Sequence, residues 1–142
     1  MYLCFGQRIL FKVLSNDANA RVEIPSDEKI REYQEIIREQ YPLLAGTWYS
    51  MDGLKLTLER SGDRVIQCNY YNGWTHDHYV SAVYVFCPDG TIPICCYNIP
   101  GSIHDSTIAR IGCIYSKLEE VYRRCGGICV VDSALQKHET IL

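Results

Sequence analysis

Residues 79–99 constrain the fold of this chain more than any other stretch. The run at 79–87, Tyr-Val-Ser-Ala-Val-Tyr-Val-Phe-Cys, is rich in the β-branched and aromatic residues that strands favour. Pro88-Asp89-Gly90 has the composition of a tight turn, and a second apolar run fills residues 91–99. The pattern therefore predicts a β-hairpin. Because its apolar character is nearly continuous, we expect both of its faces to be covered.

A further strand is predicted upstream, over residues 47–58, where apolar and polar residues alternate from Leu54 to Leu58. Asp52 interrupts the apolar pattern, and Gly53 follows it. A carboxylate within an apolar strand has to be paired, hydrated or bound to a cation, because burying it alone is costly. Asp-Gly is also a common turn signal. Both interpretations of Asp52 are open at this point.

Helices are predicted around these strands. One apolar face indicates a short helix at residues 2–14, and a second helix is expected from a Ser26 cap to about Gln40. A third helical segment is predicted over residues 105–124, in two pieces that meet near Gly112. Gly-Gly at 126–127 is expected to end it.

The wholly apolar run 128–131 predicts a buried strand that is parallel to a neighbour. Residues 65–68 are assigned as a short strand and residues 69–74 as an aromatic loop. A helical crossover from the hairpin would place the run 128–131 beside the strand at 47–58. The sequence therefore predicts an α/β fold with a mixed sheet.

Composition restricts the classes of function. With 142 residues, 47% of them hydrophobic, the chain can form one domain with a core, and its net charge of −3 gives no overall basic field. This disfavours a free-standing DNA-binding module but allows an enzyme that approaches DNA through metal ions. The eight cysteines lie mostly in apolar runs, which favours free thiols over zinc or disulfides. We find no secretory signal and no membrane-spanning run.

Three aspartates are candidates for chemistry. Asp52 and Asp132 each lie in or just after an apolar strand, and the two strands are expected to be neighbours. Close carboxylates repel unless a cation lies between them or one stays protonated, and Mg²⁺ or Mn²⁺ prefers such oxygen ligands. Asp105 follows Gly-Ser-Ile-His and is expected to cap a helix, with metal ligation as the alternative.

His76-Asp77-His78 resembles a metal-binding cluster, but its position after a glycine-containing loop favours the start of a hairpin. The nearby aromatic residues Tyr70, Tyr71 and Trp74 could stack on bases. Aromatic residues that close the end of a sheet are the commoner interpretation.

An ordered series of motifs over residues 45–135 resembles the DDE superfamily endonucleases of the PIF/Harbinger transposase type. The motifs are Asp52-Gly53-Leu54-Lys55, Tyr71-Asn72-Gly73-Trp74, Pro88-Asp89-Gly90, Pro100-Gly101-Ser102-Ile103-His104-Asp105-Ser106 and Val131-Asp132-Ser133-Ala134. The resemblance implies a ribonuclease-H-like fold, with a β-hairpin, a helical crossover and a central parallel strand. It also implies a nuclear, metal-dependent nuclease that cuts DNA at transposon ends.

In this family the first acid lies on the first strand and the second just after the fourth, which corresponds to Asp52 and Asp132. Asp105 corresponds to the acid of the Gly-Ser-x-x-Asp motif. The resemblance therefore implies a divalent cation held by Asp52 and Asp132, with Asp105 as a further contributor.

The chain departs from the family pattern after Asp132. The family's third acid comes from a later helix, whereas Glu139 follows Asp132 by only seven residues, and Leu135 replaces an aromatic residue. We therefore expect residues 1–44 to be a helical lead-in and residues 45–142 to be a DDE domain that is incomplete at its carboxyl end. Little or no DNA cleavage by this chain alone is expected. The sequence leaves open whether a partner protein supplies DNA binding. The alternative is a non-catalytic, domesticated interaction module.

Overall fold

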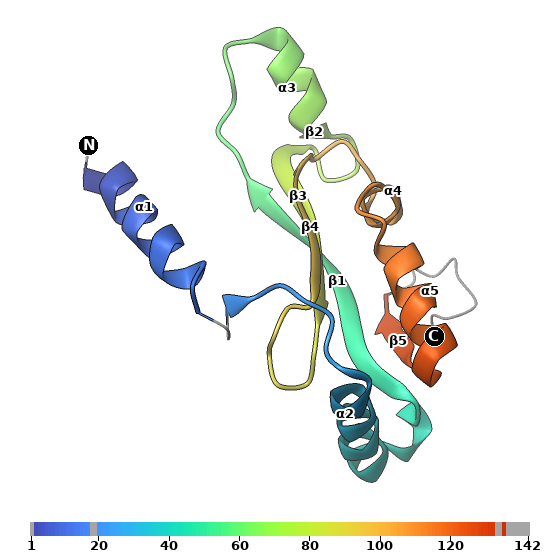
Figure 1. Cartoon of the computed structure of the whole chain (residues 1–142). Coiled ribbons are helices and arrows are strands. Elements are labelled where there is room, and N and C mark those ends of the chain that lie inside the picture. Colours follow the sequence, from blue (N-terminus) through green and yellow to red (C-terminus); the bar gives the residue numbers. More distant parts are fainter. Residues whose placement is uncertain (1, 18–19, 133–134, 136–142) are drawn as a thin grey trace.

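The computed structural model describes residues 2–17, 20–132 and 135. Its elements, in chain order, are α1 (Tyr2–Leu14), α2 (Asp27–Gln40), the 3₁₀ helix η2 (Pro42–Leu44), β1 (Thr47–Thr57), α3 (Arg64–Tyr70), β2 (Tyr71–Asn72), β3 (Asp77–Phe86), β4 (Ile94–Pro100), α4 (Asp105–Ile111), α5 (Ile114–Cys125) and β5 (Ile128–Val131). Figure 1 shows the long strands of the sheet between α1 on one side and α4 and α5 on the other.

The sheet is mixed, as predicted. Its strand order is β2-β3-β1-β5, and β4 also pairs with β3. β3 is antiparallel to both β1 and β4, which confirms the hairpin, while β5 runs parallel to β1. In the described part of the chain β5 lies at the end of the strand order, beside β1. This mixed α/β arrangement, with a helical crossover from β4 to β5, agrees with a ribonuclease-H-like fold.

One face of the sheet is covered by α4 and α5 (Figure 1). Apolar side chains from the sheet and from both helices form the core there, all of them buried: Met51, Val83, Val85, Ile94, Ile108, Ala109, Ile114, Leu118 and Val121. The break between the two helices occurs at Gly112 and Cys113, where Cys113 has a φ of 52°. Gly126 ends α5 with a φ of 68°, as the Gly-Gly pair predicts.

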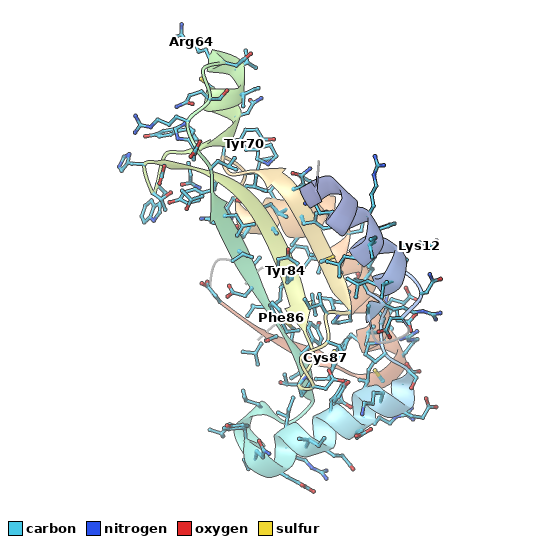
Figure 2. The ribbon with its side chains drawn as sticks, turned by 90° about the vertical axis from the view of Figure 1, so that its left-hand side faces the viewer. Lys12, Arg64, Tyr70, Tyr84, Phe86 and Cys87 are labelled. Atoms are coloured by element: carbon cyan, nitrogen blue, oxygen red, sulfur yellow. The ribbon has the colours of Figure 1, made fainter. Side chains whose placement is uncertain are left out.

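The opposite face of the sheet is open. Asp52 pairs with Tyr84, and Ser50 with Phe86, so these side chains alternate with the buried ones along the same strands. Leu54 is 45% exposed, Leu56 is 55% exposed and Phe86 is 36% exposed. The prediction that both faces of the hairpin are covered is confirmed only in part, because Phe86 and Tyr97 are exposed whereas Ala82 and His78 of β3 are buried. Figure 2, which looks toward this face, shows Tyr84 and Phe86 along it.

The amino-terminal part of β1 is held by α2 and by the turn before β5. Gln34 of α2 donates from Nε2 to the carbonyl oxygen of Gly46 at 2.9 Å. Trp48 is fully buried, and a Cβ atom at Gly127 would lie 2.5 Å from its ring. Only glycine fits this close approach of strand and turn. The contacts fix where β1 enters the sheet, and thus where Asp52 lies.

Residues 64–70 form the helix α3 and not the strand and loop assigned from the sequence. Oδ1 of Asp63 accepts hydrogen bonds from the backbone N–H groups of Val65 and Ile66, at 2.8 Å and 3.1 Å. These bonds satisfy two of the donors that a helix start leaves open. The four residues 65–68, Val-Ile-Gln-Cys, are too few to show a periodicity that separates strand from helix, and the Asp63 cap favours the helix.

The turn of the β3–β4 hairpin is longer than predicted, and β4 begins at Ile94. Asp89 explains the extension, because its Oδ1 accepts from both the backbone N–H and the hydroxyl of Thr91, at 3.0 Å and 2.7 Å. His76-Asp77-His78 lies at the start of the β2–β3 hairpin, in agreement with the interpretation of this motif as a hairpin.

The described cysteine side chains are free thiols, as expected. Cys87 and Cys129 are buried, Cys68 and Cys113 are exposed, and the others are intermediate. Among the described residues, none of the helices has the length and apolar character needed to cross a membrane.

Candidate metal site

Asp52 and Asp132 follow the same register position on two neighbouring parallel strands. Met51 of β1 pairs with Val131 of β5, and each aspartate is the next residue of its chain. Neighbouring strands lie about 4.8 Å apart, so the two acids start from adjacent backbone positions. Both residues are exposed. The structure thus brings together the backbone positions of the two acids that the sequence predicts as a pair.

Asp52 lies within β1, which rules out the turn as its explanation. Its Oδ1 accepts the backbone N–H of Gly53 at 2.7 Å. This local bond orients the carboxylate along the strand and leaves Oδ2 for another partner. The side chain borders a hollow of about 330 Å³ on the open face, lined also by Leu54, Tyr84, Phe86 and Ile92. A carboxylate beside apolar and aromatic walls is less shielded by water than one on a flat surface.

Asp105 approaches the same strand from the other side. It is the first residue of α4, and its carboxylate packs against Gly53, where a Cβ atom would lie 2.5 Å from Oδ2. The side-chain direction of Gly53 is opposite to that of Asp52, because successive residues of a strand point to opposite faces. The strand itself therefore separates the carboxylate of Asp105 from the side on which Asp52 lies.

The expected capping role of Asp105 belongs instead to the residue before it. His104 is the N-cap of α4, and its Nδ1 accepts from the backbone N–H of Ser106 at 3.4 Å and contacts the Ser106 hydroxyl at 2.9 Å. Oδ1 of Asp105 is buried and has no hydrogen-bond partner among the described residues. The absence of a side chain at Gly53 is therefore explained by the space that the Asp105 carboxylate occupies. The buried position of Asp105 Oδ1 is not explained by any hydrogen bond among the described residues.

The ligand set fits a divalent cation with a small number of protein ligands. Mg²⁺ is often held by one or two carboxylates, with waters completing its shell, and two neighbouring acids match that need. Within residues 2–17, 20–132 and 135, no group of three or more His, Cys, Asp or Glu side chains is arranged to hold a metal ion. Glu139 lies outside the described residues. The assignment of Asp52, Asp132 and Asp105 as ligands stays a prediction.

Tyr84 and Phe86 are neighbours of Asp52 that sequence reasoning missed. Their rings are 6.0 Å apart and both border the hollow beside Asp52. The available signal was their two-residue spacing within the run 79–87, which puts them on one face of the strand. Without the pairing register, however, nothing in the sequence links that face to Asp52.

The buried titratable side chains of the strands that lead to the two acids stay uncharged near neutral pH. Burial raises the pKa of the Tyr49 hydroxyl in β1 and of the Cys129 thiol in β5 far above their usual values. Burial also raises the pKa of the Cys87 thiol to about 11. These three buried groups therefore add no charge to this part of the sheet near neutral pH.

The sequence model of the DDE superfamily endonuclease family matches residues 51–141 of the chain. The match begins one residue before Asp52 and includes Asp105 and Asp132. No curated protein and no solved structure matches the chain significantly. Since the family match covers more than half of the sequence, and the mixed sheet agrees with a ribonuclease-H-like fold, the chain belongs to the DDE superfamily of endonucleases.

Proposed function

We propose that this chain is a PIF/Harbinger-type, transposase-derived domain that binds a divalent cation for the hydrolysis of DNA phosphodiesters. The observation that carries the proposal is the register of β1 and β5, in which Met51 pairs with Val131, so that Asp52 and Asp132 follow paired residues on neighbouring strands. The ordered motifs between Asp52 and Asp132 support the Harbinger type, and DNA is the substrate that membership of this family implies.

Asp52 and Asp132 would hold the cation, which would be Mg²⁺ or Mn²⁺. When bound, such an ion activates a water molecule and stabilises the leaving oxygen in phosphodiester hydrolysis. The residues of this chain would bind and orient the cation. The Gly53 N–H fixes one oxygen of Asp52, and the hollow lined by Tyr84 and Phe86 borders the same carboxylate. Asp105 contacts Gly53 from the covered face, which weighs against a role as third ligand.

We further propose that the chain alone cleaves DNA weakly or not at all. In the described part of the chain, no third ligating side chain joins the aspartate pair. A net charge of −3 gives little electrostatic attraction to DNA. A partner protein would then strengthen the binding of DNA, and the complex would act in the nucleus. Residues 1–44 would form a helical lead-in to a DDE domain at 45–142.

The first test is a titration with Mn²⁺ followed by thermal unfolding. A ligand that binds only the folded state raises its stability, so Mn²⁺ should raise the melting temperature of the wild-type chain. Asp52→Asn should abolish the rise, whereas Asp105→Asn should retain it. An unchanged melting temperature in the wild type, or an equal rise in Asp52→Asn, would contradict the metal site. A supercoiled-plasmid nicking assay with Mg²⁺ tests the second proposal, which robust nicking lost in Asp52→Asn would overturn.

The second candidate function is a non-catalytic interaction module. The apolar exposure of the open face supports it, because Leu54 and Leu56 are large side chains without a covering helix among the described residues. The same Mn²⁺ titration separates the two candidates. If neither the wild type nor Asp52→Ala responds to the metal, the interaction module is the better account.

A further inference from the structure

A second hollow lies at the far end of the open face, beneath α3. It has a volume of about 280 Å³ and is lined by Leu58, Glu59, Ser61, Ile66, Gln67, Tyr70, His78 and Val80. The lining residues come from the segment that follows β1, from α3 and from the start of β3. Figure 2 shows Tyr70 at the upper end of the face along which Tyr84 and Phe86 lie. The hollow is separate from the one beside Asp52, with which it shares no lining residue.

His78 is the unusual residue of this hollow. It is only 5% exposed, and neither Nδ1 nor Nε2 has a hydrogen-bond partner among the described residues. The nearest carboxylate oxygen, Oδ1 of Asp77, lies 3.9 Å from Nδ1, beyond hydrogen-bond distance, and accepts the His78 backbone N–H. Buried polar groups are nearly always paired. The imidazole of His78 therefore lines the hollow with two ring nitrogens that can form hydrogen bonds to a ligand.

The chemistry around His78 suits a flat heteroaromatic ring. A neutral imidazole offers one donor and one acceptor. Gln67 accepts the Ser61 N–H with Oε1 at 2.9 Å, and the amide nitrogen of the same side chain carries two further donors. The remaining walls are mostly apolar, formed by Leu58, Ile66 and Val80 and the ring of Tyr70, and Ser61 and Glu59 complete the lining. Apolar and aromatic walls with a few polar groups are how proteins bind an unstacked nucleobase.

The position of the hollow relative to Asp52 is compatible with one continuous DNA strand. The backbone N–H of Leu58 donates to the carbonyl oxygen of His78, which continues the β1–β3 ladder beyond Thr57. Leu58 and His78 therefore share the face of Asp52 and Tyr84. Six residues of strand span about 20 Å. At about 3.4 Å per nucleotide along a strand, this corresponds to on the order of six nucleotides.

We propose that the hollow around His78 binds an unstacked base of the DNA strand that lies along the open face. Nδ1 or Nε2 of His78 would pair with the edge of the base, and Tyr70 would contact its ring. The proposal rests on the proposed function in one respect, because DNA as the ligand comes from membership of the endonuclease family.

The test compares two fluorescent oligonucleotides of twelve positions, one with mixed bases and one abasic at every position, bound to the full 142-residue chain in EDTA. The wild type should bind the base-bearing strand at least about fivefold more tightly, since one stacked base contributes that much or more. His78→Leu should lose this preference without weakening binding of the abasic strand. His76→Asn is the matched control: His76 is exposed, has a φ of 58°, which asparagine tolerates, and does not line the hollow.

A second measurement covers the case in which His78→Leu does not fold. Side-chain ¹⁵N NMR of wild-type histidines should show the His78 ring nitrogens shift with the base-bearing strand and not with the abasic one. Equal affinity for both strands, or an unmoved His78 resonance when DNA binds, would overturn the base pocket. So would the absence of binding to either strand. Because the Mn²⁺ titration contains no DNA, any of these outcomes leaves the metal-site proposal to be judged separately.

Discussion

The two faces of the sheet are formed by alternate side chains of the same strands, but they have different roles. On the face under α4 and α5, the side chains of Met51, Val83 and Val85 are buried in a continuous core. On the other face, one residue along each strand, Asp52 and Tyr84 border an open hollow. The covered face holds the fold together, and the open face carries every feature that we connect with function. Because the two sets alternate within single strands, the core fixes the geometry of the open face.

This comparison explains why the acids can be close without destabilising the domain. Asp52 and Asp132 are exposed, so each retains hydration and neither requires a buried countercharge. Asp105, in contrast, sends one unpaired carboxylate oxygen into the covered side. An exposed acid pair keeps its hydration at little cost in stability, whereas a buried carboxylate oxygen has to be accommodated by its neighbours.

The largest expected effect comes from making the same leucine-to-alanine substitution on each of the two faces of the sheet. Leu118 of α5 is fully buried and Leu56 of β1 is 55% exposed. Leu118→Ala should lower the free energy of unfolding by about 2–5 kcal/mol, because it removes buried methyl groups and leaves a cavity. Leu56→Ala should cost less than about 1 kcal/mol. Urea unfolding measures both, and comparable losses would mean that the open face is covered in solution.

A substitution at Gly53 tests how closely the Asp105 carboxylate approaches β1. A Cβ atom there would lie 2.5 Å from Oδ2 of Asp105, so Gly53→Ala should cost about 1–3 kcal/mol of unfolding free energy. The cost should fall when Asp105→Ala is added, since the second change removes the clashing carboxylate. Additive losses in this double-mutant cycle would show that the two residues are not in contact.

The buried thiols of the core should make the fold sensitive to alkali. The pKa of Cys87 is raised to about 11 by burial, against about 8.5 for a free thiol. The stabilisation is therefore complete below about pH 8.5 and is lost as pH rises toward 11, by up to about 1.4 kcal/mol per pH unit. Thermal unfolding from pH 7 to 10.5 should show a shallower decline for Cys87→Ala. The exposed Cys113 gives the control, because Cys113→Ala should leave the decline unchanged.

A smaller effect is expected where α2 meets the hairpin turn. The Tyr33 hydroxyl donates to Oδ2 of Asp89 at 2.5 Å, and this bond is the main cause of a lowered Asp89 pKa. Tyr33→Phe should cost about 1 kcal/mol at pH 7. Since the folded pKa lies below the unfolded value of about 3.9, the difference between wild type and variant should be full above pH 4. It should shrink as pH falls through the folded pKa, and a difference that does not change with pH below 4 would contradict this assignment.

Much of the fold could be predicted because its long elements have strong patterns. The hairpin, the break in the helix at Gly112 and the parallel strand at 128–131 follow from apolar runs and glycine positions. α3 was missed because Val65 and Ile66 fit either a strand or a helix, although the cap at Asp63 was visible in the sequence. Local patterns are reliable where they are long and ambiguous where they cover one turn.

The open face could not be predicted, for a different reason. The continuous apolar run of β3 indicates two apolar faces but not which of them helices cover. Likewise, the sequence pairs Asp52 with Asp132 by pattern, but the approach of Asp105 to Gly53 depends on how α4 packs against the sheet. Such tertiary contacts join residues that are about fifty positions apart, and no local signal records them.

The most direct test of the metal site uses Mn²⁺ as a paramagnetic probe in NMR. In the wild-type chain, substoichiometric Mn²⁺ should broaden the backbone amide signals of Gly53 and Tyr84, next to Asp52, while Leu118 in the covered core stays sharp. Asp52→Asn should remove this broadening. Broadening that is absent from Gly53 and Tyr84 in the wild type, or that persists unchanged in Asp52→Asn, would contradict the claim that the open face holds the cation through Asp52.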